Sequence, residues 1–282
     1  MKIHDRCYGC LLGRIAYESR LSTDDEGRIA HVLSECNTLL GSLRGVPRPA
    51  SLVASAAHRR AYELLGDPDP YRRIKETSTE VAIRACQAVR PTLAGFRDYA
   101  LASVIANTFD YGVASHRVTG DFMAFFRREF AKGFLIDDTA EMEELVSEVV
   151  YFTDNAGEII FDRLFIGYLA GRGARVTVAV KGAPILNDAT LAEAEGAGLG
   201  RIALVTTTGS GDIGVNLGKI PRDLREALDR CTLVIAKGMA NYEALTEYDK
   251  LPPTAYLMAV KCPTIAESVG ALEGSLIAML EE

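Results

Sequence analysis

Polar side chains follow four successive apolar runs in the second half of the chain, at the point where each run ends. They are Asp154, Asn155 and Glu158 after the first run, Lys181 and Asp188 after the second, and Lys237 and Asn241 after the fourth. After the third run, three threonines at 206–208 lead into a turn that contains Gly209 and Gly211. In an open parallel sheet the carboxyl ends of the strands meet at one edge, where loops and helix N-termini bind ligands. The sequence therefore predicts a single site assembled from four strand ends.

The types of these residues limit the chemistry of that site. Asp154, Asn155 and Asp188 offer hard oxygen atoms, which suit a partly hydrated divalent cation such as Mg²⁺ or Mn²⁺. Lys181 and Lys237 offer positive charge, and lysine is scarce in this chain beside arginine. A metal, two lysines and helix N-termini together describe a pocket for a phosphorylated ligand.

Some of these positions allow a second interpretation. Glu158 is predicted either to act as a base beside the metal or to satisfy backbone donors at the start of a helix. Asn241 is predicted either to contact the substrate or to serve in the same way at a helix start. The turn that contains Gly209 and Gly211 is expected to offer backbone N–H groups to phosphate oxygens.

The elements that must position these residues alternate in type. Apolar runs at 149–154, 176–181, 202–207, 233–238 and 255–260 alternate with helical stretches at 158–173, 187–198, 221–231, 241–247 and 263–280. Near-continuous apolar strands that alternate with helices are typical of a parallel sheet covered on both faces. Residues 146–282 are therefore predicted to form an α/β domain.

Residues 1–145 show a helical period instead. Apolar residues recur at helical spacing in 10–20, 27–40, 51–66, 71–89, 93–112 and 121–133, and no convincing strand precedes residue 135. We therefore predict a helical domain over residues 1–145. It contains every histidine of the chain, and we expect these at surface or capping positions: His4, His31, His58 and His116.

The overall charge excludes some classes of partner. With 31 basic and 38 acidic residues the net charge is −7, which argues against nucleic acid and anionic membranes as partners. No apolar run is long enough to span a membrane, and the first residues lack the apolar core of a signal peptide. The six cysteines are too few for a disulfide scaffold, so we expect reduced thiols and a cytoplasmic protein.

Two other enzyme classes use a similar sheet and are kept as alternatives. Residues 209–214 match the Gly-x-Gly-x-x-Gly pattern of dinucleotide-binding oxidoreductases, but they follow the third apolar run and no helix opens directly after them. An S-adenosylmethionine-dependent methyltransferase usually has a glycine-rich turn after its first strand, where this chain has Asp154 and Asn155. Both alternatives fit the residues less well than phosphoryl chemistry does.

Longer motifs resemble those of the DUF89 family, the metal-dependent damage-control phosphatases. The similar segments are 107–112, 154–158, 181–188 and 236–243, with Tyr111 where Phe is usual in the family. The Cys-x-x-Cys spacing of Cys7 and Cys10 and the segment 261–263 resemble motifs of the stand-alone archaeal and bacterial branch of the family. The resemblance covers essentially the whole chain. It implies a helical N-terminal region packed on a Rossmann-like three-layer α/β/α domain.

The resemblance also implies a reaction, the hydrolysis of phosphate esters of small metabolites such as sugar phosphates or damaged phosphometabolites. Asp154, Asn155 and Asp188 would hold the divalent ion, which is Mg²⁺, Mn²⁺, Co²⁺ or Ni²⁺ in the family. Lys237, assisted by Lys181, would contact the phosphate.

Asn107 and Asp110 would line the cleft from the helical region. The nucleophile is either Asp154 itself or a water activated by the metal with the help of Glu158 or Asp188. The motifs specify neither the ester, nor the preferred metal, nor the oligomeric state.

Cys7 and Cys10 allow two interpretations. With Cys262 and His4 brought close by folding, they would form a metal or redox site. Otherwise they are buried or free thiols.

Overall fold

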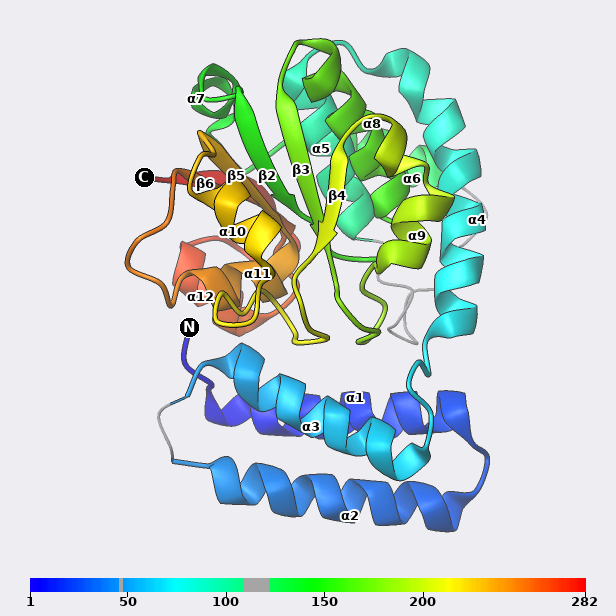
Figure 1. Cartoon of the computed structure of the whole chain (residues 1–282). Coiled ribbons are helices and arrows are strands. Elements are labelled where there is room, and N and C mark those ends of the chain that lie inside the picture. Colours follow the sequence, from blue (N-terminus) through cyan, green and yellow to red (C-terminus); the bar gives the residue numbers. More distant parts are fainter. Residues whose placement is uncertain (46–47, 109–121) are drawn as a thin grey trace.

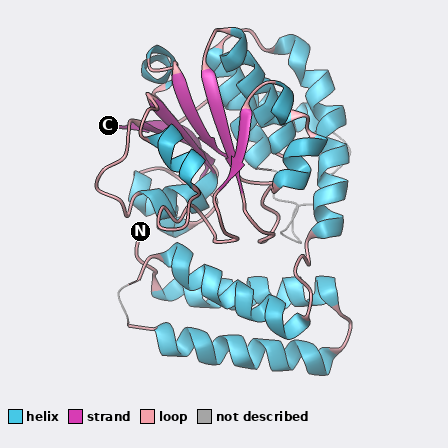
Figure 2. Cartoon of the chain, in the orientation of Figure 1, coloured by secondary structure: helices cyan, strands magenta, loops and turns pink. Residues whose placement is uncertain are grey.

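The chain folds into an α/β structure in which helices cover both faces of one sheet (Figures 1 and 2). A computed structural model describes residues 1–45, 48–108 and 122–282, without the side chains of residues 122 and 123. Helices α1, α2 and α3 lie together beyond the edge of the sheet toward which the strand arrows point (Figure 1). The predicted fold class, a helical N-terminal region on a three-layer domain with a mainly parallel sheet, is confirmed.

The first three helices share a hydrophobic core of their own. They are α1 (Asp5–Ser22), α2 (Glu26–Leu43) and α3 (Ala50–Leu65). Asp25 caps α2 by accepting a hydrogen bond from the Arg28 N–H, and Gly66 ends α3 in the left-handed conformation with φ of 60°. Ile185 and Ile213, from two loops of the sheet domain, are buried in this same core. The bundle therefore docks on those loops.

The next helices share a hydrophobic cluster with the sheet domain. They are α4 (Arg72–Val89), the short 3₁₀ turn η1 (Arg90–Thr92), α5 (Phe96–Asn107), α6 (Phe122–Lys132) and α7 (Thr139–Glu144). One hydrophobic cluster joins Val89 and Leu101 of these helices to Tyr151 and Phe165 of the sheet domain. The hydrophobic clusters therefore divide between α3 and α4. The division into domains at residue 145 stays a prediction.

Seven strands form one sheet within the described residues, in the order β1-β7-β6-β5-β2-β3-β4. The strands are β1 (Ile136–Asp137), β2 (Glu148–Phe152), β3 (Arg175–Val180), β4 (Leu204–Thr207), β5 (Leu233–Lys237), β6 (Thr254–Ala259) and β7 (Leu276–Glu281). All neighbouring pairs are parallel except β6 with β7. The chain runs outward from β2 to β4 on one side and from β5 on the other. Strands β2 and β5 therefore flank the topological switch point, where ligands bind in open sheets.

Helices on the two faces use alternate residues of each strand. They are α8 (Ile159–Gly171), α9 (Leu191–Gly196), η2 (Leu199–Arg201), α10 (Arg222–Leu228), α11 (Gly238–Leu245) and α12 (Pro263–Val269). In β2, Val149 and Tyr151 join the cluster that contains α5 and α8, whereas Val150 and Phe152 join the cluster that contains α10 and α11. The central strands are thus buried on both faces, as their apolar runs predict.

The prediction of one long helix over 263–280 is wrong. Helix α12 ends at Val269, Gly270 follows with φ of 66°, and residues Leu276–Glu281 form β7, which pairs antiparallel with β6. Two glycines with positive φ, Gly270 and Gly274, reverse the chain between the two elements. Leu276, Ile277 and Ala278 of β7 are buried, and β7 pairs with both β6 and β1, which outweighs the helical propensity of this segment.

None of the helices in the described part of the chain combines the length and apolar character that crossing a membrane requires.

Candidate active site

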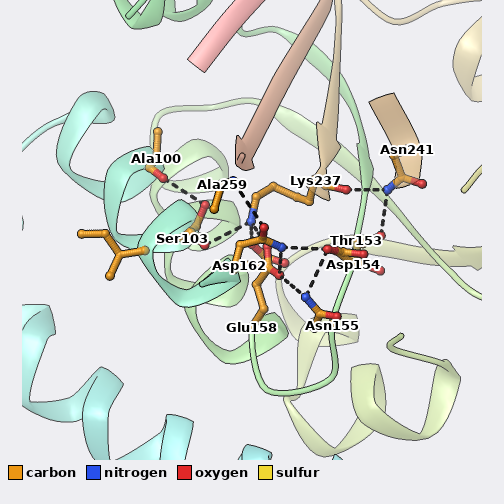
Figure 3. A network of polar contacts seen from close by, with 12 residues as sticks. Ala100, Ser103, Thr153, Asp154, Asn155, Glu158, Asp162, Lys237, Asn241 and Ala259 are labelled. Atoms are coloured by element: carbon orange, nitrogen blue, oxygen red, sulfur yellow. Dashed lines mark hydrogen bonds and ion pairs between the residues drawn. The ribbon is translucent and has the colours of Figure 1, made fainter. Parts of the chain in front are cut away.

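Asp154 stands at the carboxyl end of β2, next to the switch point. Its Oδ2 atom accepts hydrogen bonds from Asn107 Nδ2 at 2.7 Å and from Asn155 Nδ2 at 3.1 Å (Figure 3). Gly238, with φ of 76°, lies against the same carboxylate, and a Cβ atom at that position would overlap Asp154 Oδ2. Two amide donors and a glycine therefore fix the orientation of this carboxylate.

The loop after β2 is joined to the loop after β3, which brings Asp188 beside Asp154. An isolated antiparallel bridge pairs Asn155 with Asp188. The Ala189 N–H donates to Asp154 O at 2.8 Å. Asn155 and Asp188 are each 5% exposed. The three residues predicted to hold a metal thus meet at one point, where Asn155 and Asp188 are buried and Asp154 is half-buried.

The electrostatics of this point favour a cation. Burial, together with the negative charges of Asp188 and Glu158, raises the pKa of Asp154 well above its ordinary value. A divalent ion held by these residues would reduce this penalty, because its positive charge would attract both carboxylates. No group of three or more His, Cys, Asp and Glu side chains in the described ranges is placed to hold a metal. The set at this point instead combines two carboxylates with an amide, a donor set that suits a hard ion that keeps water ligands.

Glu158 lies beside Asp154, at the start of α8. Its Oε2 atom accepts from Asn107 Nδ2 at 2.6 Å and from Asn155 Nδ2 at 3.1 Å, and its Oε1 atom contacts Lys237 Nζ (Figure 3). Its side chain makes no capping hydrogen bond to the helix. The helix-start interpretation of Glu158 is therefore wrong.

Lys237 is fully buried at the end of β5 and its amine faces the protein interior. Nζ pairs with Glu158, with Asp162 Oδ1 at 2.8 Å and with Ser103 O at 3.3 Å. Burial opposes the charge on this amine, but the carboxylates of Asp162 and Glu158 outweigh that effect and raise the pKa of Lys237. For the neighbouring carboxyl of Asp162, burial raises the pKa to about 6, although the positive charge of Lys237 opposes the rise. The structure thus places the amine among three protein acceptors.

Lys181 lies at the end of β3 and is also buried. Its Nζ atom donates to Gly214 O at 2.7 Å and lies 3.4 Å from Asp188 Oδ2. It therefore connects the loop after β4 to Asp188.

The glycine turn after β4 is tightly packed. Gly209 has φ of 76° and its N–H donates to Thr207 Oγ1 at 3.2 Å, and a Cβ atom on Gly209 would overlap Lys219 O. A Cβ atom on Gly211 would lie 3.1 Å from Ala183 O. Gly209 therefore allows the loop after β4 to fold back closely on Lys219, and Gly211 allows this loop to approach the loop after β3.

Asn241 links the ends of the two central strands. Its Nδ2 atom donates to Thr153 O at 3.1 Å and to Lys237 O at 2.7 Å (Figure 3). Because the side chain donates to carbonyl oxygens and accepts no N–H at the helix start, the capping interpretation is wrong. Its Oδ1 atom is buried and has no hydrogen-bond partner among the described residues.

Asn107 reaches the site from the end of α5, as predicted. It is fully buried, and its Oδ1 atom accepts from the Ala259 N–H at 3.4 Å. Asn107 therefore connects Asp154, Glu158 and the end of β6. The second residue predicted from this region, Asp110, lies outside the described residues together with Tyr111.

Two site residues escaped the sequence-based prediction. Lys261 follows β6, is half-buried, and its positive charge acts against the rise in the pKa of Asp154. Its position at the end of the fifth apolar run is the same signal that identified Lys237. Asp162, which pairs with Lys237 and accepts from Tyr151 OH at 2.7 Å, was signalled only by a carboxylate within an otherwise apolar helical stretch.

The cysteines are spread over the chain, whereas the histidines all lie within residues 1–145. All six cysteines are free, with Cys7 and Cys262 half-buried and Cys10 exposed. His4 and His31 are exposed, as expected. The surface prediction is wrong for His58, which is fully buried with its Nδ1 atom 2.9 Å from Glu18 Oε1 in the core of the bundle. The buried carboxylate stabilises this histidine away from water.

The sequence is similar to a known protein family over nearly its whole length. Residues 3–277 match the model of the damage-control phosphatase ARMT1-like domain. The chain is 38% identical to a damage-control phosphatase of Archaeoglobus fulgidus over the full length of both chains. It is 28% identical to damage-control phosphatase PH1575 of Pyrococcus horikoshii, over 99% of this chain and 98% of that protein.

A solved structure agrees with the sequence matches. The crystal structure of a DUF89 family protein from Pyrococcus horikoshii superposes with a TM-score of 0.93 at 27% identity, covering all of both chains. None of these matches supports the methyltransferase or the oxidoreductase alternative. The match over nearly the whole chain and the relative at 38% identity show that this chain belongs to the ARMT1-like (DUF89) family of damage-control phosphatases.

Proposed function

We propose that this chain is a divalent-metal-dependent phosphatase that hydrolyses phosphate esters of small metabolites at the edge where β2, β3, β5 and β6 end. The observation that supports this most directly is the bridge between the Asp154–Asn155 loop and Asp188. It brings the half-buried Asp154 beside the buried Asp188, with Glu158 close by, and burial together with these negative charges raises the pKa of Asp154. The names of the relatives in Archaeoglobus and Pyrococcus agree with this activity.

Asp154, Asn155 and Asp188 are the residues proposed to hold the metal, which is Mg²⁺, Mn²⁺, Co²⁺ or Ni²⁺. The chemistry that such an ion supplies is stabilisation of the charge that develops on the phosphoryl oxygens. Asn107 supports the set by donating to Asp154 and Glu158, so that both carboxylates keep one orientation. Asp110 is proposed to line the same cleft on the family resemblance alone.

We assign the phosphate contact to Lys261 as well as to the lysines that the strand ends suggest. Lys261 is half-buried beside Asp154, and its Nζ atom has no hydrogen bond or ion pair with any other residue of the described ranges. Lys237 and Lys181 already bind protein acceptors. Their proposed contribution is to hold Glu158 and Asp188 in place, with any phosphate contact coming through a rearrangement of these pairs.

The hydrogen bonds also bear on the nucleophile. Both carboxylate oxygens of Glu158 accept hydrogen bonds in this structure, which disfavours Glu158 as the group that takes a proton from water. We therefore propose two routes, attack by the carboxylate of Asp154 or attack by a water that Asp188 deprotonates. Trapping with beryllium fluoride separates them, because a stable adduct on Asp154 supports the first route.

The test of the function is phosphatase activity of Asp154→Asn and Asp188→Asn variants. Each is assayed with a panel of sugar phosphates, nucleotides and cofactor precursors, with each divalent metal in turn. We expect phosphate release by the wild type to depend on metal and to fall at least about a hundredfold in both variants. Asp223→Asn, an exposed position on α10, is the matched control. Wild-type turnover in both site variants would contradict the proposal.

A further inference from the structure

The loop that leads to Asp188 contains a strained residue. Leu186 has φ of 47°. All other described residues with positive φ are glycines. A branched apolar side chain in the left-handed region costs about 1 kcal/mol or more, so the surrounding structure must enforce this conformation. The Asp188 N–H donates back to Ile185 O at 3.1 Å, which closes a tight turn around Leu186.

The contact that holds Leu186 comes from the helical bundle. Tyr62 of α3 accepts a hydrogen bond from the Leu186 N–H at 3.0 Å. Tyr62 is 8% exposed, and burial raises the pKa of its hydroxyl above the ordinary value, so the acceptor is the neutral phenol. Ile185 is buried in the bundle core, and Leu186 packs against it. Both the backbone and the side chains of this turn are thus fixed by α3 and its neighbours.

The same face of α3 holds the neighbouring loop after β4. Ser55 Oγ accepts from the Ile213 N–H at 2.8 Å, and Arg59 pairs with the buried Asp212. Ser55, Arg59 and Tyr62 are spaced four and three residues apart, which places them along one face of the helix. This face therefore contacts the loops that follow β3 and β4.

We propose that Tyr62 is a positioning residue for Asp188, and that it acts by fixing the strained Leu186 backbone two residues before this carboxylate. The proposal rests on the function proposed above, in which Asp188 holds the metal. Removal of the hydroxyl leaves the Leu186 N–H without its partner and allows the turn to relax. Asp188 then loses its fixed place beside Asp154.

The test compares Tyr62→Phe with Tyr248→Phe. Tyr248 is a matched control, because its hydroxyl also accepts a backbone N–H at 3.0 Å, from Leu217, in a segment that does not lead to Asp188. The first measurement is hydrogen exchange of residues 183–189 in the metal-free proteins. We expect exchange about tenfold faster in Tyr62→Phe and unchanged in Tyr248→Phe.

The second measurement is Mn²⁺ binding, followed by the electron paramagnetic resonance of free Mn²⁺. We expect the dissociation constant to rise about tenfold in Tyr62→Phe, as for other groups that orient metal ligands, and to stay at the wild-type value in Tyr248→Phe. Melting temperatures of both variants establish that they remain folded.

The outcomes separate this inference from the proposed function. Wild-type exchange over residues 183–189 in Tyr62→Phe overturns the role of Tyr62, and so does faster exchange with unchanged Mn²⁺ affinity. If the wild type itself binds no Mn²⁺, the proposed metal site is contradicted. In that case the exchange measurement alone decides whether Tyr62 fixes the turn.

Discussion

The Cα atom of Gly238 lies directly against the carboxylate of Asp154, so that any side chain at residue 238 would occupy the place of Asp154 Oδ2. This contact joins the start of α11 to the end of β2, across the switch point of the sheet. A backbone without a side chain at this position is thus a condition for the orientation of the proposed metal ligand.

Gly238→Ala is predicted to abolish activity and to destabilise the fold. The new methyl group must displace Asp154, and the positive φ adds strain, which together cost about 2–4 kcal/mol. Gly270→Ala is the control, because Gly270 also has positive φ but no atom near its missing Cβ. Urea unfolding and phosphatase assays of both variants check this. Equal behaviour of the two variants would show that only backbone strain matters at residue 238.

Replacement by methionine is predicted to lower stability at Lys237 and to weaken substrate binding at Lys261. Lys237→Met leaves Glu158 and Asp162 buried without their cation, so the free energy of unfolding falls by about 3–5 kcal/mol. Lys261→Met removes a half-buried amine that pairs with no described residue, so stability stays within about 1 kcal/mol while KM for the phosphate ester rises. Thermal melting and steady-state kinetics distinguish the two. A large stability loss in Lys261→Met would argue against its role as a phosphate ligand.

Asp188→Asn is predicted to lose the stabilisation that a bound metal gives. In the presence of a chelator two effects of the variant oppose each other, because it removes the repulsion that raises the pKa of Asp154 and also removes the partner of the buried Lys181 amine. With saturating Mn²⁺ the wild type gains about 2–3 kcal/mol from binding and the variant gains little. Calorimetry under both conditions measures this. A variant that the metal stabilises as much as the wild type would exclude Asp188 from the ligand set.

Glu243 is predicted to make the stability depend on pH. Burial raises its pKa from 4.5 to about 7, although the chain's amino terminus opposes the rise. The folded state therefore holds a proton that the unfolded state releases, and stability falls as pH rises from about 4.5 to about 7. Glu243→Gln removes this pH dependence. The free energy of unfolding of the variant minus that of the wild type is therefore expected to increase by roughly 2 kcal/mol across that range. Urea unfolding of both proteins at pH 5 and pH 8 measures this difference. A difference that is smaller at pH 8 than at pH 5 would contradict the prediction.

The carboxyl ends of the strands could be predicted from the sequence because the apolar runs are short, continuous and separated by helical stretches. Asp154, Asn155 and Asp188 were placed at one edge on that basis, and the structure brings them together. The pattern failed at residues 276–281, where Leu, Ala and Met suit a helix as well as a strand. Only the pairing with β6 and β1 decides between the two.

The environment of a side chain was harder to predict than its position. The Lys237 amine is surrounded by Ser103 O and Asp162, which lie 134 and 75 residues away in the sequence. No local pattern encodes such partners, because they arise from the packing of α5 and α8 on the sheet. The same limit applies to His58, whose buried partner Glu18 is 40 residues away.

Strand β7 has a consequence for how the protein is made on the ribosome. It lies between β6 and β1, and the Leu280 N–H donates to Asp138 across 142 residues of sequence. When β1 and α7 have left the ribosome, almost the whole second half of the chain has still to be translated. Only then can β7 pair with β1 and β6. During that interval the edge of β6 that later pairs with β7 has no strand partner and is open to chaperones and to other nascent chains. The pairing of β7 with β6 and β1 therefore closes an exposed strand edge only after translation has passed residue 281.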